Sequence, residues 1–135
     1  MKILLDTHIL LWAIAGDSQL SPEAIKLITD EENELYYSTA SVWEIQIKHM
    51  AKPDKMRIGG TFLSEKAKEL GCRMLPIYDK HVELLETLHR PESAKEHHDP
   101  FDRIMLAQAK SEGLFFLTHD NLIKDYNESC VITAS

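Results

Sequence analysis

Acidic side chains recur in this sequence at the points where apolar runs end. Asp6 follows the apolar run Ile3–Leu5, and Asp120 ends another such run near the end of the chain. Glu44 and Asp102 each lie early in a segment with helical periodicity. If the four residues meet, their carboxylate oxygens provide the ligands that hard divalent cations such as Mg²⁺ and Mn²⁺ prefer. The acids therefore predict a metal site, and no residue stands out as a protein nucleophile.

Each of these acids also fits a local structural role. The spacing Ser41-x-x-Glu44 matches a capping box, in which Glu44 would bond only to the amide of the helix cap. Asp99-Pro100 is a typical helix start, with Asp102 favourably placed in the first turn. The two acids at strand ends could close turns or cap helices. Capping does not require all of them to share one edge of a sheet, so we expect the four acids to bind metal. Asp99 is interpreted as a helix cap and not as a first ligand of the metal.

Hydroxyl and imidazole groups lie close to the acids in the sequence. Three hydroxyl residues belong to this group: Thr7, Ser38 and Thr118. They could orient metal-bound waters or could be ordinary polar residues at strand ends, and both interpretations stay open at this point. His97, His98 and His119 look like metal ligands, but the sequence lacks an HExxH motif and any zinc-like Cys/His spacing. We therefore interpret these histidines as polar neighbours of an acidic pocket.

Basic residues concentrate in one segment of this acidic chain: Lys48, His49, Lys52, Lys55 and Arg57. One interpretation is a helix carboxyl terminus whose cations match the helix dipole. The other is a contact surface for a polyanion such as a nucleic-acid backbone. Under the second interpretation we expect Lys48, Lys52 and Arg57 to bind the substrate.

The spacing of apolar residues predicts strands that alternate with helices. Runs of β-forming residues predict strands at 3–5, 35–38, 72–77, 114–117 and 131–132. Helical periodicity and capping residues predict helices at about 9–13, 22–32, 41–52, 61–70, 79–89, 99–110 and 121–126. This alternation predicts an α/β protein with a parallel sheet covered on both faces. Because parallel strands share one carboxyl edge, Asp6, Glu44 and Asp120 should meet there, and Asp102 joins them if its helix begins at that edge.

Composition places the chain among ordinary globular proteins. Its 135 residues predict a single domain, residues 1–135, with 44% hydrophobic and 27% charged residues. The 15 Lys and Arg against 22 Asp and Glu leave a net charge of -7, which disfavours a general nucleic-acid coat or a binder of acidic membranes. It does not exclude an enzyme that acts on nucleic acid through metal ions. Two cysteines without a CxxC motif, and no signal peptide or apolar membrane span, predict a cytoplasmic protein with free thiols.

Four segments, in this order, resemble the motifs of PIN-domain nucleases: ILLDTHILLW, STASVWEIQIK, HHDPFDRIMLAQA and FLTHD. The likeness covers residues 2–133 and is greatest to the VapC-type ribonuclease toxins of bacterial and archaeal toxin–antitoxin pairs. The resemblance implies a three-layer α/β/α sandwich around a parallel sheet. It also implies a homodimer and a small antitoxin protein as partner. The metal-binding catalytic acids that it implies are Asp6, Glu44, Asp102 and Asp120, with Asp99 accessory.

The chemistry expected of such a site is metal-assisted attack of water on an RNA phosphodiester. One or two Mg²⁺ or Mn²⁺ ions would lower the pKa of a bound water and neutralise the charge that develops on the phosphate. Two alternatives are a Mg²⁺-binding phosphotransfer module and a phosphatase with an acidic pocket. The phosphotransfer module would need a second acid after the first strand and a lysine after its last strands, and neither is where it should be. The phosphatase would need a D-x-D motif after the first strand, where this chain has His8.

Overall fold

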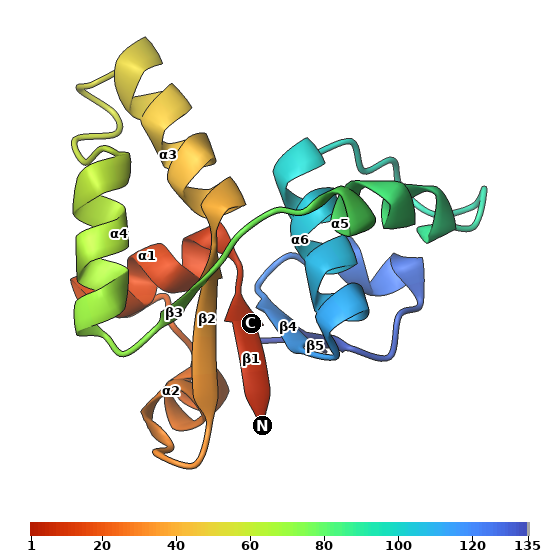
Figure 1. Ribbon diagram of the computed structural model, residues 1–135, viewed down its shortest axis with the longest axis horizontal. Helices are drawn as coiled ribbons and strands as arrows, with labels where there is room; N and C mark the ends of the chain where they lie inside the picture. Colours follow the sequence, from red (N-terminus) through yellow and green to blue (C-terminus); the bar gives the residue numbers. More distant parts are fainter. Residues whose placement is uncertain (135) are drawn as a thin grey trace.

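Five parallel strands form the centre of the structure, a computed structural model that describes residues 1–134 (Figure 1). Their order across the sheet is β3, β2, β1, β4 and β5, and each neighbouring pair is parallel. The strands comprise Arg73–Leu75 (β3), Glu34–Ser38 (β2), Lys2–Leu5 (β1), Phe115–Thr118 (β4) and Val131–Thr133 (β5). The predicted parallel sheet, including its last strand, is therefore confirmed.

Helices cover both faces of this sheet, which confirms the three-layer α/β/α architecture. In chain order they are α1 (Thr7–Ala15), α2 (Pro22–Thr29), α3 (Thr39–Ala51), α4 (Gly60–Glu69), α5 (Asp79–Glu83), the 3₁₀ helix η1 (Leu84–Thr87), α6 (Pro100–Glu112) and the 3₁₀ helix η2 (Ile123–Tyr126). Figure 1 shows α1 and α4 on one side of the sheet and α5 and α6 on the other.

The side chains of β1 alternate between two separate hydrophobic cores. Ile3 and Leu5 pack with residues of α1, α2 and α4 in one core, while Leu4 packs with α6 and the 3₁₀ helices in the other. All three side chains are fully buried. A strand covered on both faces needs apolar residues at every position, which is why the run Ile3–Leu5 lacks the polar alternation of a half-exposed strand.

The strand order reverses between β1 and β4. The chain passes from β1 outward to β2 and β3, and then returns to β4 on the opposite side of β1. In an open α/β sheet, such a reversal creates a crevice at the carboxyl edge, and ligands bind there. Asp6 directly follows β1, and Asp120 follows β4 after one intervening residue. The topology therefore places two of the predicted site acids at this crevice.

The ends of a few elements differ from the sequence prediction. Helix α2 ends at Thr29 and does not continue to about Glu32, because the backbone of Asp30 is already extended (φ -72°, ψ 114°). Strand β3 ends at Leu75, where the following Pro76 has no N–H to donate to a neighbouring strand. These differences leave the order of elements as predicted.

Both cysteines are free thiols in the described chain, as predicted, with Cys72 buried and Cys130 half-buried. Burial raises the pKa of Cys72 to about 11, which suits an unreactive thiol that serves packing alone. None of the helices within residues 1–134 is long and apolar enough to cross a membrane.

Candidate metal and active site

Asp6 is fixed at the crevice by hydrogen bonds to both of its carboxylate oxygens. Its Oδ1 accepts from the N–H of Ile9 at 2.8 Å, so the residue caps α1. Its Oδ2 accepts from the Thr118 hydroxyl at 2.5 Å and from the N–H of His119 at 3.3 Å. The contacts with Thr118 and His119 place this side chain beside the end of β4, and 2% of the residue is exposed. Capping and membership of the acidic site are therefore compatible for this residue.

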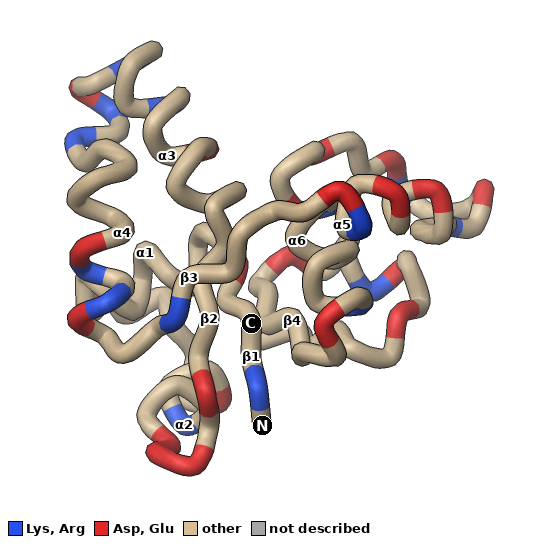
Figure 2. The backbone as a smooth tube through the Cα atoms, viewed as in Figure 1, with Lys and Arg blue, Asp and Glu red and all other residues tan. Residues whose placement is uncertain are grey.

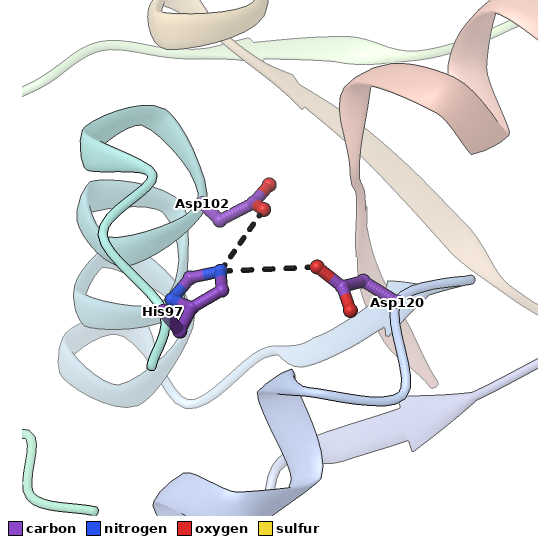
Figure 3. Close-up of side chains that lie close together, drawn as sticks. All are labelled: His97, Asp102 and Asp120. Atoms are coloured by element: carbon purple, nitrogen blue, oxygen red, sulfur yellow. Dashed lines mark hydrogen bonds and ion pairs between the residues drawn. The ribbon is translucent and has the colours of Figure 1, made fainter. Parts of the chain in front are cut away.

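Asp102 and Asp120 approach each other across an imidazole (Figure 3). The Nε2 atom of His97 lies 3.3 Å from Asp102 Oδ2 and 3.8 Å from Asp120 Oδ2. Asp102 comes from the first turn of α6, Asp120 from the loop after β4, and His97 from the loop that precedes α6. The other Asp120 oxygen, Oδ1, accepts from the N–H of Leu122 at 2.8 Å and so orients this side chain.

Asp102 carries the clearest electrostatic signature of the site. The pKa of its carboxyl is raised to about 8, first by burial and then by the negative charges of Asp99, Asp6, Glu44 and Asp120. These neighbours include all of the acids that the sequence predicts for the site. The structure therefore brings the predicted acids within electrostatic reach of one carboxyl at the carboxyl edge of the sheet.

The pKa values of two histidines of the site are shifted in opposite directions. Burial lowers the pKa of His97, which favours the neutral imidazole. The hydrogen bond with Asp6 raises the pKa of His119, whose Nδ1 lies 3.4 Å from Asp6 Oδ2. Both rings lie beside carboxylates of the site, whereas His98 is exposed and pairs with Glu96.

Glu44 is buried, with 4% of the residue exposed, and forms an ion pair with Lys48 at 2.7 Å. The capping-box interpretation of Glu44 is wrong, because α3 begins at Thr39 and its cap is Ser38, whose hydroxyl accepts from the N–H of Ala40. Glu44 therefore lies in the second turn, too far along the helix to bond to the cap amide. Lys48 is therefore already paired with a carboxylate when no substrate is bound.

Asp99 and the three hydroxyl residues predicted near the site differ in their contacts. Asp99 caps α6 by accepting from the N–H groups of Phe101 at 2.9 Å and Asp102 at 3.1 Å, as its interpretation as a cap predicts. The Thr118 hydroxyl contacts Asp6 directly. The hydroxyls of Thr7 and Ser38 instead bond to other buried side chains: Ser41 for Thr7 and Gln108 for Ser38.

The basic segment lies at the end of α3 and in the loop to α4 (Figure 2). Lys48 lies in the last turn of α3, where its charge matches the helix dipole, and Lys52 is the residue that ends the helix. Three lysines line one surface hollow of about 240 Å³: Lys48, Lys52 and Lys55. The helix-end interpretation and the polyanion interpretation are therefore compatible with the same positions.

The position of His97 in the sequence predicts that it lies near the pocket but does not indicate which groups it contacts. Its imidazole is held at the far side by Tyr126, whose hydroxyl lies 2.8 Å from Nδ1. The available signal was the position of His97 two residues before the cap Asp99 and five before Asp102. Nothing in the sequence indicates that Tyr126, which follows β4, would return to this loop.

The groups at this edge fit a hard divalent cation. His97, Asp102 and Asp120 each offer one ligand atom, and the three atoms lie within 4.8 Å of one another. Carboxylate oxygens are the ligands that Mg²⁺ and Mn²⁺ prefer. The raised pKa of Asp102 arises in part from uncompensated negative charge, which is the condition that a bound cation relieves.

The parallel sheet, its strand reversal and the acids at its carboxyl edge define an α/β protein with an acidic site at the switch point. The sequence profile of the PIN domain matches residues 3–128, and the chain therefore belongs to the PIN-domain family. No curated protein sequence matches the chain.

Solved structures with the same fold include components of toxin–antitoxin systems. VapBC2 from Rickettsia felis, bound to a DNA fragment from its promoter, is similar with a TM-score of 0.67 and 16% identity over 100% of both chains. A toxin–antitoxin complex from Klebsiella pneumoniae has a TM-score of 0.61 and 20% identity, with 97% of this chain and 96% of that chain covered. FitAcB from Neisseria gonorrhoeae has a TM-score of 0.62 and 19% identity over the same shares. At these identities the likeness shows a shared fold.

Proposed function

We propose that this protein is a metal-dependent endoribonuclease and the toxin of a toxin–antitoxin pair. The observation that carries the proposal is the raised pKa of Asp102, because its causes are burial and the charges of the other predicted acids. Buried carboxylates that lie close together repel one another and destabilise the metal-free protein. A purely structural role therefore does not explain why these acids lie together. Membership of the PIN-domain family supports nuclease chemistry for the same site.

The proposed metal ligands are the acids at the carboxyl edge: Asp6, Glu44, Asp102 and Asp120, with Asp99 accessory. Bound Mg²⁺ or Mn²⁺ would activate a water and neutralise the charge that develops on the phosphodiester. Asp6 needs no rearrangement to serve there, because Ile9, Thr118 and His119 already orient its carboxylate. The Thr118 hydroxyl contributes to this orientation by donating to Asp6 Oδ2.

The proposed substrate is RNA, held by the basic segment at the end of α3. With a net charge of -7, the chain cannot attract a polyanion over its whole surface, so contacts must be local. The hollow lined by three lysines supplies such a local positive surface, and we propose Lys48, Lys52 and Arg57 as its phosphate contacts. Lys48 would exchange Glu44 for a phosphate when a cation occupies the site.

Two protein partners belong to this proposal. An antitoxin is supported by the structural neighbours, which are described as toxin–antitoxin complexes or as VapBC2. A homodimer of a single 1–135 domain is supported by apolar side chains that α3 leaves exposed at helical spacing: Trp43 (58%), Ile47 (43%) and Met50 (71%). An apolar stripe of this kind on a small protein is typical of an interaction surface.

The test is cleavage of single-stranded RNA by purified protein in Mg²⁺ or Mn²⁺ and in EDTA. We expect cleavage only with metal, and loss of cleavage in a folded Asp6→Asn variant. Asp17→Asn is the matched control, because Asp17 lies beyond the other end of α1 and accepts a backbone hydrogen bond that asparagine can also accept. Wild-type rates in Asp6→Asn would show that the site is assigned incorrectly.

A further inference from the structure

The group formed by His97, Asp102 and Asp120 contains one histidine beside its two acids. His97 is buried, with 8% of the residue exposed, and its Nε2 atom points between Asp102 and Asp120 (Figure 3). A buried imidazole that only filled space could lie against apolar side chains. This ring instead presents a nitrogen to the two carboxylates that the proposed function assigns to the metal.

The spacing of these three groups is close to that of ligands around one ion. Two donor atoms that each bind one small divalent cation at about 2.1 Å lie no more than about 4.2 Å apart. The Nε2 atom of His97 is 3.3 Å from Asp102 Oδ2 and 3.8 Å from Asp120 Oδ2. All three donor atoms lie within 4.8 Å of one another, so small side-chain rotations would bring the set around a cation.

The other nitrogen of His97 has the partner that a metal-bound imidazole needs. Its Nδ1 lies 2.8 Å from the hydroxyl of Tyr126, which is buried. A hydroxyl can either donate or accept, so Tyr126 can accept from Nδ1–H when Nε2 offers its lone pair to a metal. Histidines that bind metals almost always donate their second N–H in this way, and this contact fixes the tautomer and the ring orientation.

The loop that carries His97 is also held in place. The guanidinium of Arg90 donates to the backbone carbonyls of Lys95 and Leu122, and so ties residues 90–95 to the segment after β4. The same guanidinium lies 4.9 Å from the centre of the Tyr126 ring. His97 is therefore positioned by contacts on both sides before any metal binds.

We propose that His97 is a nitrogen ligand of the divalent cation, that Tyr126 positions it, and that this ligand makes the site prefer Mn²⁺ to Mg²⁺. The inference rests on the proposed function, because it assumes that Asp102 and Asp120 hold a metal. Mg²⁺ favours oxygen ligands, whereas imidazole nitrogen suits transition metals. An all-carboxylate site lacks this source of preference.

The test uses the full chain with Mn²⁺ or Mg²⁺ alone and without RNA. Electron spin echo envelope modulation of the Mn²⁺ complex detects nitrogen bound to the metal, and calorimetry measures the dissociation constants of both ions. The variants are His97→Gln, which keeps a polar side chain of similar size, and Tyr126→Phe, which keeps the ring beside Arg90. His98→Ala is the matched control, because His98 is adjacent but exposed and, among the described residues, pairs with exposed Glu96.

We expect nitrogen modulation in the wild type and in His98→Ala, and its loss in His97→Gln. Mn²⁺ binding should weaken by about 10-fold or more in His97→Gln and by about 10-fold in Tyr126→Phe, with a smaller change for Mg²⁺ in both. Mn²⁺ binding without nitrogen modulation, or modulation that persists in His97→Gln, overturns the inference and leaves the proposed acidic metal site intact. Absence of Mn²⁺ and Mg²⁺ binding to the wild type overturns both.

Discussion

Replacing Asp102 with asparagine tests how much the ionised, clustered acids lower the stability of the metal-free protein. The pKa of Asp102 is raised from 3.8 to about 8 in the folded protein, and the folded state therefore binds a proton that the unfolded state has released. The stabilisation from this proton is complete below pH 4 and is lost as the pH rises toward 8. At about 1.4 kcal/mol per pKa unit, the loss between pH 5 and pH 8 is on the order of 4 kcal/mol. Asparagine has a similar shape and does not titrate, so the variant avoids this loss.

The assay is urea unfolding of wild type and Asp102→Asn in EDTA at pH 5 and pH 8. The stability of the variant relative to wild type should increase by about 4 kcal/mol between the two pH values. Asp54→Asn is a control for the general effect of removing a negative charge, because Asp54 is exposed in the loop after α3. Saturating Mn²⁺ should stabilise the wild type at pH 8, by about 2.7 kcal/mol at 100 times the dissociation constant, and should stabilise Asp102→Asn much less.

A structural role for Asp102 predicts the opposite sign. A charged carboxylate in the first turn of α6 would interact favourably with the helix dipole, and its loss would cost about 0.3–1 kcal/mol at pH 8. A variant that is less stable than wild type at pH 8, together with a wild type that does not respond to Mn²⁺, would refute the metal-site reasoning.

Three further predictions concern the groups around the site. Asp99→Ala should lower the free energy of unfolding by about 1 kcal/mol in EDTA, whereas Asp99→Asn should retain the cap; urea titration of both variants checks this. Replacing the basic segment by alanine should flatten the salt dependence of RNA binding by about one unit of slope per lost phosphate contact, and an unchanged slope would leave these residues as helix-end cations. That variant changes four residues: Lys48, Lys52, Lys55 and Arg57. Trp43→Ser should shift the protein from dimer toward monomer in light scattering, and an unchanged mass would remove Trp43 from the proposed interface.

The pattern of apolar residues was enough to predict the sheet and the edge at which the acids lie. Apolar runs such as Ile3–Leu5 alternate with helical segments, and this pattern is sufficient for a parallel sheet with both faces covered. Parallel strands share one carboxyl edge, so an acid after each run must lie there whatever the order of the strands. For this reason Asp6 and Asp120 could be assigned to one site before the structure was known.

Local signals were less informative about where α3 begins. Ser38 and Ser41 are both suitable caps by residue type, and only the second places an acid three residues later. The structure selects Ser38, because its hydroxyl also bonds to Gln108 on α6, 70 residues away in the sequence. A cap chosen by a distant contact cannot be identified from the neighbouring residues.

The neutral groups that join the acids are selected by contacts that form only when the chain is folded. The position of β4 beside β1 brings Thr118 and His119 to Asp6, and the return of η2 brings Tyr126 to His97. These contacts join residues that are far apart in the chain, and several strand orders are compatible with the same alternation of elements. Because the orientation of an imidazole depends on the partner of its second nitrogen, the role of His97 was decided by the packing of Tyr126.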